Sequence, residues 1–302
     1  MQHATIFCTI AGVETHEKHA MPAISSLHIY PVKSLQGITL PQAALTTQGL
    51  AFDRQWMLVD AEGKFVTQRQ LPTLARIRVR LTAASLELEH AGLPPLSIPL
   101  EPPPTTSCEV QVWRDVCDAC EESADASRWL TQAVGQWQGH DLRLVRFAPG
   151  FIRPVDPADM DGAHAETAFS DGYPFLIVSE ASLDALNAQL QANGADAVPM
   201  ERFRPNIVLS GLEAFGENAC KTLTAAHSGY SLAIRKPCQR CKITTIDQHS
   251  GLISDPKEPL RTLTAMNPYP HLSGAYFGQN ATLTTGDGAL VKVGDLLEMH
   301  MR

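Results

Sequence analysis

The stretch QWMLVDAEGKFVTQ, residues 55–68, is typical of two β-strands joined by a tight turn. Apolar and aromatic residues fill Gln55–Asp60 and Phe65–Gln68, and Asp60-Ala61-Glu62-Gly63 between them has the composition of a hairpin turn. The same strand-like pattern recurs outward from it, at Leu27–Val32, Ile77–Leu81, Leu96–Leu100 and Cys108–Trp113. The first third of the chain therefore predicts a small all-β unit, a sandwich or a barrel.

Helical periodicity first becomes clear over Ser127–Trp137, and Ser179 is placed to cap a second helix that runs to about Leu190. Other strand-like runs and one short helix follow, at Leu142–Phe147, Tyr173–Val178, Ile207–Leu209, Ser231–Ile234, Lys242–Ile246, Pro259–Met266 (the helix), Ala281–Thr285 and Leu290–Val293. Strands dominate here too. We therefore expect a mainly β chain with some α (α+β), in which a small N-terminal β-barrel domain precedes a second β-barrel domain with peripheral helices.

Composition excludes several classes of protein. The 302 residues carry 24 basic and 32 acidic side chains, and this net charge of −8 argues against a nucleic-acid partner. No apolar run approaches the length of about 20 residues that a membrane span needs. The first twenty residues have no signal-peptide or transit-peptide pattern, so we expect a cytoplasmic protein. Seven cysteines form no disulfide framework, and reduced thiols are expected.

Two C-x-x-C pairs could carry chemistry, Cys117 with Cys120 and Cys238 with Cys241. A shared zinc site is disfavoured because 117 residues separate the pairs. Cys117 and Cys120 are interpreted as incidental thiols. The second pair is flanked by Lys236 and Arg240, and nearby cations favour the thiolate that a soft metal centre or a redox reaction would use. The residues alone do not choose between Cys238 and Cys241.

Cations also gather where predicted strands begin or end. Lys33 and Ser34 follow one strand, Arg54 precedes another, and Arg202 and Arg204 precede a third. Ammonium, hydroxyl and guanidinium groups are the usual partners of phosphate. Each residue taken singly is better explained as a solvated surface charge or a salt-bridge partner, but together in an acidic protein they indicate an anionic ligand.

These blocks resemble a known family. Residues 29–34 (IYPVKS), 49–57 (GLAFDRQWM) and 67–69 (TQR) are similar to the β-barrel domain that precedes MOSC domains. Residues 169–171 (FSD), 202–207 (RFRPNI), 236–241 (KPCQRC), 244–247 (TTID), 277–280 (FGQN) and 293–295 (VGD) are similar to the MOSC domain itself. The order resembles that of the mitochondrial amidoxime-reducing component and its bacterial counterparts. It implies a leader over 1–24, the N-terminal domain over 25–115, a linking helix, strand and loop over 116–165, and the MOSC domain over 166–302.

The resemblance implies a molybdenum cofactor, a pterin whose dithiolene binds molybdenum and whose phosphate is held by cations. By its place in the motif, Cys241 would be the protein ligand of the metal and the catalytic residue, with Cys238 a neighbour. Lys33, Ser34 and Arg54 match contacts to the pterin phosphate. The remaining matching positions around the pterin and metal are Ser170, Arg204, Asn206, Gln239 and Arg240.

The implied activity is the reduction of N-hydroxylated compounds (amidoximes, hydroxylamines and N-hydroxylated bases) by oxygen-atom removal at molybdenum. No cysteine follows Cys241, so no ferredoxin-like extension is expected and electrons would come from a separate ferredoxin-like, flavin or haem protein. The alternative is a carrier of the cofactor or of sulfur that uses a Cys241 persulfide. The acidic loop 154–168, with Asp156, Asp159, Asp161 and His164, is interpreted as a solvated loop in preference to a substrate lid.

Overall fold

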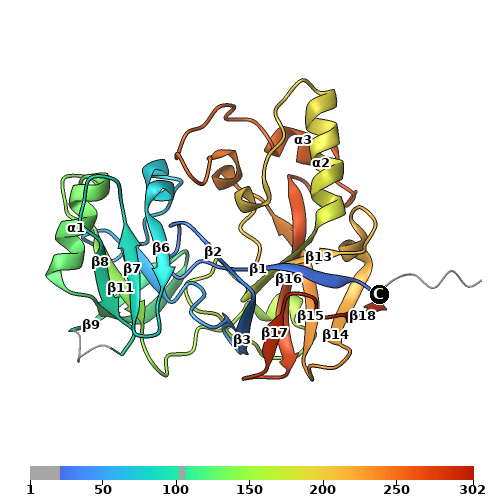
Figure 1. Ribbon diagram of the computed structural model, residues 1–302, viewed down its shortest axis with the longest axis horizontal. Helices are drawn as coiled ribbons and strands as arrows, with labels where there is room; N and C mark the ends of the chain where they lie inside the picture. Colours follow the sequence, from blue (N-terminus) through green and yellow to red (C-terminus); the bar gives the residue numbers. More distant parts are fainter. Residues whose placement is uncertain (1–20, 102–105) are drawn as a thin grey trace, which may run out of the picture.

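The computed structural model describes residues 21–101 and 106–302, so most of the leader expected over 1–24 lies outside the described residues. Figure 1 shows two β-rich halves side by side, one containing α1 and β6 to β9 and the other β13 to β18. Strand β1 (Ala23–Ile29), although it begins the described chain, lies within the second half. The functional residues described below lie where the two halves meet.

The second half is built on a mixed sheet of eight strands in the order β18-β14-β15-β16-β12-β13-β1-β2. Besides β1, they are β2 (Ile38–Leu40), β12 (Phe175–Ser179), β13 (Ile207–Ser210), β14 (Cys220–Ala225), β15 (Ser231–Gln239), β16 (Tyr276–Thr285) and β18 (Leu297–Met301). Only β12 and β13 are parallel neighbours. Both are continuous apolar runs, as expected for central strands covered on two faces.

A single bridge between Ala23 and Leu296 joins β1 to the segment before β18. The eight-stranded sheet therefore curls back on itself without a continuous hydrogen-bonded ladder at that seam. The predicted mainly β architecture with few helices is confirmed. The predicted second barrel is a curled sheet in which the start of β1, the strand next to the edge strand β2, meets the segment before β18 at this one bridge.

Residues near the start of the chain complete this half. A three-stranded sheet joins β17 (Leu290–Lys292) to β3 (Gln42–Thr46) and β4 (Gly49–Leu50). Side chains from β1, β3 and β4 share one hydrophobic core with those of β12 to β18. Strand pairing thus ties residues 23–50 to the second half, although the N-terminal domain expected from the sequence begins at residue 25.

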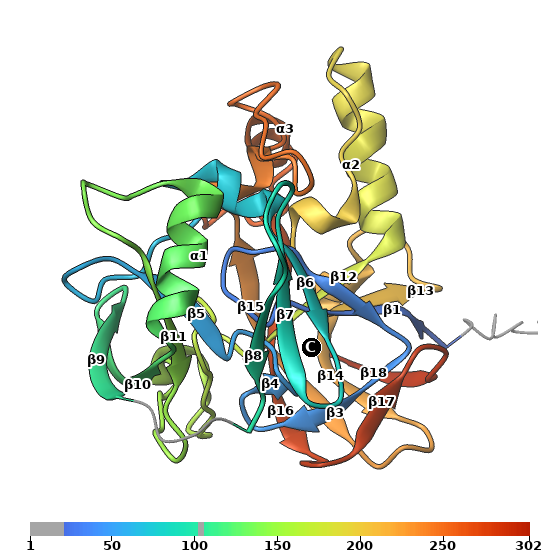
Figure 2. The same cartoon turned by 60° about the vertical axis from the view of Figure 1, so that its left-hand side comes forward.

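The first half contains two smaller antiparallel sheets. One is ordered β5-β11-β10-β9, with β5 (Trp56–Val59), β11 (Arg143–Phe147), β10 (Asp115–Glu121) and β9 (Thr106–Val112). The other comprises β6 (Arg78–Leu81), β7 (Ser85–Glu89) and β8 (Leu96–Pro99), and Figure 2 brings it to the front. Helix α1 (Ala124–Val134) contributes Trp129 and Leu130 to the core between them.

The predicted turn after β5 is present, but β5 has a different ladder partner. Gly63 adopts φ of +80°, and a Cβ there would lie 3.0 Å from the Glu109 carbonyl oxygen, so the turn requires glycine. After the turn, Phe65 pairs with Val59 in one isolated β-bridge. The continuous hydrogen-bonded ladder of β5 is formed with β11. Residues 65–68 therefore form a connection and not the strand that the sequence predicts.

Helix α2 (Glu180–Ala192) begins as predicted, because the Ser179 hydroxyl accepts a hydrogen bond from the Ser182 amide. A short α3 (Leu260–Ala265) packs near it, in agreement with the predicted helix over 259–266. The 3₁₀ turns are η1 (Pro72–Arg76), η2 (Pro157–Asp159), η3 (Met200–Arg202), η4 (Gly216–Ala219) and η5 (Lys242–Thr245).

The prediction of a strand over Lys242–Ile246 is wrong, because these residues form η5. The Thr244 hydroxyl donates to the Cys241 carbonyl at 3.0 Å, and the Thr245 hydroxyl donates to the Lys242 carbonyl at 2.8 Å. Such local bonds satisfy the backbone in a tight turn and compete with a sheet ladder. Cys241 thus precedes a helical turn, at the point where β15 ends.

Candidate functional site

Side chains from both halves converge on one depression, which we call the central cleft. Eight of the nine site residues predicted from the sequence line it: Lys33, Ser34, Arg54, Ser170, Arg204, Asn206, Arg240 and Cys241. The cleft encloses about 730 Å³ of space, its open mouth included. Residues more than 200 positions apart in the chain are therefore neighbours here, because β1, β13 and β15 belong to one sheet.

Two arginines are held on the ring of one buried tyrosine. The guanidinium carbons of Arg54 and Arg204 lie 4.3 and 4.1 Å from the centre of the Tyr30 ring. Arg54 also donates to the Asp53 carboxylate at 2.5 Å and to the Asn206 side-chain oxygen at 3.2 Å. These contacts fix both guanidinium planes before any ligand binds, which lowers the entropic cost of recognition.

The backbone is strained at these positions. Ser34, Arg54 and Arg204 have φ values of +71°, +49° and +55°. The left-handed region costs a non-glycine residue about 1–2 kcal/mol. Three such residues in one cleft indicate that tertiary contacts hold them there, as is common at ligand-binding sites.

Several polar atoms in the cleft are buried and lack a hydrogen-bond partner among the described residues. They are Nη2 of Arg69, Nη2 of Arg204, Nε of Arg240 and Oγ of Ser170. An unpaired buried donor costs about 1–3 kcal/mol, more when it is charged. This set of cationic donors and one hydroxyl matches the oxygens of an anion such as a phosphate group.

Lys33 contributes a buried ammonium to the same cleft. Its Nζ donates to the Asp171 carboxylate and to the Phe169 carbonyl, both at 2.7 Å. Burial lowers the pKa of Lys33 to about 8, although the Asp171 carboxylate opposes that shift. Lys33 therefore changes charge at a pH close to neutrality, unlike an ordinary surface lysine.

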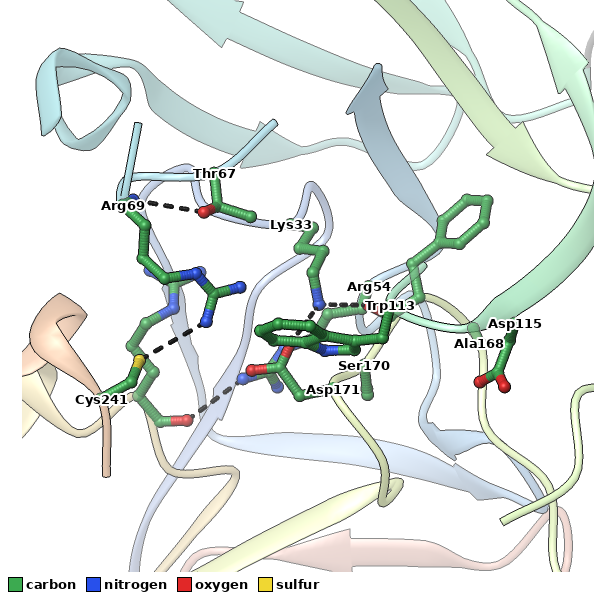
Figure 3. A network of polar contacts seen from close by, with 12 residues as sticks. Lys33, Arg54, Thr67, Arg69, Trp113, Asp115, Ala168, Ser170, Asp171 and Cys241 are labelled. Atoms are coloured by element: carbon green, nitrogen blue, oxygen red, sulfur yellow. Dashed lines mark hydrogen bonds and ion pairs between the residues drawn. The ribbon is translucent and has the colours of Figure 1, made fainter. Parts of the chain in front are cut away.

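Cys241 and Cys238 both line the central cleft, and each thiol faces a different arginine. The Arg69 guanidinium lies 3.6 Å from Sγ of Cys241, as Figure 3 shows. Arg240 lies 2.9 Å from Sγ of Cys238. Both sulfurs thus face the cleft beside a guanidinium group, and cysteine sulfur is the kind of ligand that a soft metal prefers.

The placement of Gln239 differs from the prediction. Cys238 and Arg240 line the cleft, and side chains of consecutive strand residues point to opposite faces. The exposed Gln239 side chain accordingly lies against Gly274, away from the cleft. Gln239 is the one predicted site residue whose side chain does not line the cleft, and its assignment as a cofactor contact stays a prediction.

Comparison with known proteins identifies the family. Residues 21–137 match the family model described as the MOSC N-terminal beta barrel domain, and residues 164–298 match the MOSC domain. The mitochondrial amidoxime-reducing component 1 of Mus musculus is 35% identical over 250 residues, which are 80% of this chain and 70% of that protein. The chain belongs to the MOSC family of the amidoxime-reducing components. The Homo sapiens protein of the same name has the same sequence identity, and the match covers the same fractions of both chains.

A second kind of MOSC protein is also similar. The molybdenum cofactor sulfurase of Arabidopsis thaliana is 26% identical over 277 residues, which are 86% of this chain but only 33% of the sulfurase. The MOSC family thus includes relatives that are named for two different activities.

The other cysteine pair lies outside the cleft of this MOSC protein. On β10, Cys117 points into a hydrophobic core while Cys120 is half-buried, and burial raises the pKa of the Cys117 thiol to about 11. Within residues 21–101 and 106–302, three or more His, Cys, Asp or Glu residues nowhere gather in a metal-binding arrangement. The structure thus offers no four-thiolate zinc site from the described cysteines.

The loop 154–168 is held more firmly than the sequence indicates. Asp159 pairs with Lys236 at 2.5 Å, Arg235 donates to the Met160 carbonyl at 3.3 Å, and the Met160 side chain is buried. Val155 is also buried. These contacts anchor the loop to β15, beside the cleft.

Sequence reasoning missed three residues of the site. Arg69 and Asp171 stand in the family-like segments 67–69 and 169–171, so their position in those motifs was an available signal. Trp113 carried no such signal: it lies at the tip of the β9–β10 hairpin and contacts Asp171 and Arg69, which line the cleft, only in the folded chain. Among the described residues, no helix combines the length and the apolar character needed to cross a membrane.

Proposed function

We propose that this MOSC protein is a molybdenum-cofactor-dependent reductase of N-hydroxylated compounds, such as amidoximes, hydroxylamines and N-hydroxylated bases. One observation supports it above all: the cleft places a cysteine thiol and several unpartnered cationic donors together. That is the donor set that a phosphate-bearing cofactor with a soft metal needs. The similarity to amidoxime-reducing components adds the reaction class.

In this proposal Lys33, Ser34 and Arg54 hold the phosphate of the cofactor. Arg204, matched in the sequence to the surroundings of the pterin and metal, joins them because its guanidinium lies with that of Arg54 on the Tyr30 ring. The residues proposed around the pterin and metal are Ser170, Asn206, Gln239 and Arg240. Cys241 is the metal ligand and the catalytic residue. When bound, the molybdenum cofactor supplies a Lewis-acidic metal with a two-electron couple.

The chain's own groups prepare this site. Arg69 donates to the Cys241 sulfur at 3.6 Å, and the Trp113 ring packs 4.4 Å from the Arg69 guanidinium carbon. The Asn206 side-chain oxygen accepts hydrogen bonds from the Leu176 amide at 3.1 Å and from Arg54. These bonds fix the side chains of Asn206 and Arg54 around the ligand. Preorganised donors of this kind need not reorient when the ligand binds.

Electrons would come from a separate protein, ferredoxin-like or of the flavin or haem reductase type. A second candidate function is a carrier of the cofactor or of sulfur that uses a Cys241 persulfide, favoured by the likeness to the Arabidopsis sulfurase. The two functions differ in stoichiometry. A reductase should purify with about one molybdenum per chain, and a transient carrier with far less.

The matched pair of variants Cys241→Ser and Cys238→Ser tests the proposal. Both sulfurs line the cleft beside an arginine, so they differ mainly in the proposed metal bond. Cys241→Ser should lose hydroxylamine reduction and most of the bound molybdenum, while Cys238→Ser should keep much of both. The reverse result would exchange the roles of the two cysteines. The proposed reductase function would be refuted if the wild type, purified from cofactor-producing cells, contained no molybdenum and reduced no N-hydroxylated compound.

A further inference from the structure

A second cavity adjoins the central cleft, and nothing in the proposed cofactor site uses it. We call it the side chamber. It encloses about 1480 Å³, its open mouth included, which is about twice the cleft on the same basis. Asp171, Gly172 and Tyr173 line both cavities, so the two cavities adjoin along this short segment. A molecule in the side chamber would therefore lie next to the cleft that Cys241 lines.

Aromatic side chains from both halves form the walls of the side chamber. Phe65 and Trp113 come from the first half and Tyr173 from the second. Phe65 and Trp113 contact edge to face, with ring centres 5.1 Å apart. Tyr173 is held by a hydrogen bond of its hydroxyl to Asp159 at 3.2 Å. Walls of this kind favour a flat, apolar guest that can stack.

Trp113 is an unusual residue for a hairpin tip. Its side chain remains 47% exposed, and its φ of +57° places a bulky residue in the left-handed region. Its indole N–H donates to the Asp171 carboxylate at 3.2 Å, and one ring face contacts the Arg69 guanidinium. Figure 3 shows the indole above Asp171, with Arg69 between it and Cys241. The ring is thus fixed in orientation while much of its surface stays open.

Charges in the side chamber are balanced, in contrast to those in the central cleft. The three cations that line it are each ion-paired: Arg114 with Asp156, Arg153 with Asp115, and Lys236 with Asp159. The unpartnered cationic donors named above belong to the cleft. An anionic guest gains little in the side chamber, so its walls suit an uncharged molecule.

Gly172 lies where the two cavities adjoin, at the boundary that we call the passage. A Cβ built on Gly172 meets no atom within 4 Å, and its φ is not in the left-handed region. A side chain here would extend into open space without straining the backbone. The position can therefore be used to narrow the passage selectively.

We propose that the side chamber is the substrate subsite and that it selects uncharged, planar aryl N-hydroxylated compounds, with Trp113 as the stacking wall and Gly172 at the passage to the metal. This inference rests on the proposed reductase function. The aryl ring would lie in the side chamber while the N–OH group enters the central cleft. A small substrate such as hydroxylamine needs no stacking wall.

The experiment compares benzamidoxime with hydroxylamine for the cofactor-loaded wild type and three variants. In Trp113→Ala the ratio of kcat/KM for benzamidoxime to that for hydroxylamine should fall about tenfold, the effect of losing one aromatic stacking partner. Gly172→Leu should lower the same ratio by obstructing the passage. Trp113→Phe keeps an aromatic face and should keep the ratio near that of the wild type.

A binding measurement separates substrate recognition from catalysis. Saturation-transfer NMR of benzamidoxime, with the loaded protein and no electron donor, should show contact with the wild type and a weaker signal with Trp113→Ala. Equal losses for both substrates, or an unchanged ratio, would overturn the inference. Loss of molybdenum from Trp113→Ala would also overturn it, because the side chamber would then belong to the cofactor. A wild type that binds benzamidoxime but reduces neither substrate would instead refute the proposed function.

Discussion

Replacing Arg204 by Met separates cofactor binding from folding, because the structure assigns opposite contributions to this side chain. Arg204 is buried, and burial lowers its pKa to about 10. That shift corresponds to about 3 kcal/mol of destabilisation from burying the charge, which Met removes. Arg204→Met also leaves the Leu35 carbonyl without its side-chain donor, at about 1–3 kcal/mol, whereas the Gln248 side-chain oxygen still accepts from Gln68 at 3.0 Å. The two effects nearly cancel, so the free energy of unfolding should change by no more than about 2 kcal/mol.

Cofactor retention should change far more. The unpartnered Nη2 of Arg204 is available to a phosphate oxygen, and a hydrogen bond to a charged group is worth about 1.5–3 kcal/mol. Molybdenum should therefore leave Arg204→Met about 10 to 150 times faster than the wild type, measured as metal remaining on the protein during dialysis. Urea unfolding of the molybdenum-free protein reports the stability.

Arg202→Met is the matched control for this experiment. Arg202 lies two residues away, but its side chain contacts the Thr244 carbonyl at 3.3 Å and the Asp247 carboxylate at 3.6 Å, outside the cleft. It should lose stability without releasing molybdenum faster. If Arg204→Met retained molybdenum as the wild type does, or if both variants released it alike, the assignment of Arg204 to the phosphate would be refuted.

Two further predictions concern the same cleft. Burial lowers the pKa of Lys33 to about 8, and only its protonated form attracts phosphate, so loading of the molybdenum-free protein with cofactor should decline from about pH 7 to about pH 9. Lys33→Arg, whose guanidinium stays protonated, should abolish that decline; a wild type with pH-independent loading contradicts the role of Lys33. Ser34→Gly should raise the free energy of unfolding by about 1 kcal/mol, because glycine tolerates the φ of +71°, yet weaken cofactor retention through loss of the hydroxyl. A urea midpoint that fell would show that the Ser34 backbone is not strained.

The sequence predicted most strands of the fold because their signal is local. The apolar run before Ser179 and the Ser179 cap are contained within a few residues, and β12 and α2 form as expected. The strand predicted over 242–246 fails because the Thr244 and Thr245 hydroxyls satisfy backbone carbonyls in a turn. Which strands pair is not local: β1 lies against β13, about 180 residues later, and no periodicity encodes that.

The same distinction between local sequence signals and tertiary contacts applies to the residues of the candidate site. Lys33, Arg54, Arg204 and Cys241 were predicted to act together from family-like segments, and the fold places them in one cleft. Gln239 is the exception: a motif does not record which face of a strand each side chain occupies, and the role of Gln239 as a cofactor contact stays a prediction. Trp113 and the side chamber depend on a hairpin of the first half approaching Tyr173 of the second, which only the tertiary structure shows.

Molybdenum X-ray absorption spectroscopy on the Cys241→Ser and Cys238→Ser variants tests the central claim most directly, because it counts the sulfur atoms bonded to the metal. We predict that the wild type and Cys238→Ser share the same number of sulfur ligands. Any molybdenum that remains in Cys241→Ser should have one sulfur fewer. An unchanged sulfur count in Cys241→Ser, or a sulfur lost only in Cys238→Ser, would contradict the assignment of Cys241 as the protein ligand of the metal.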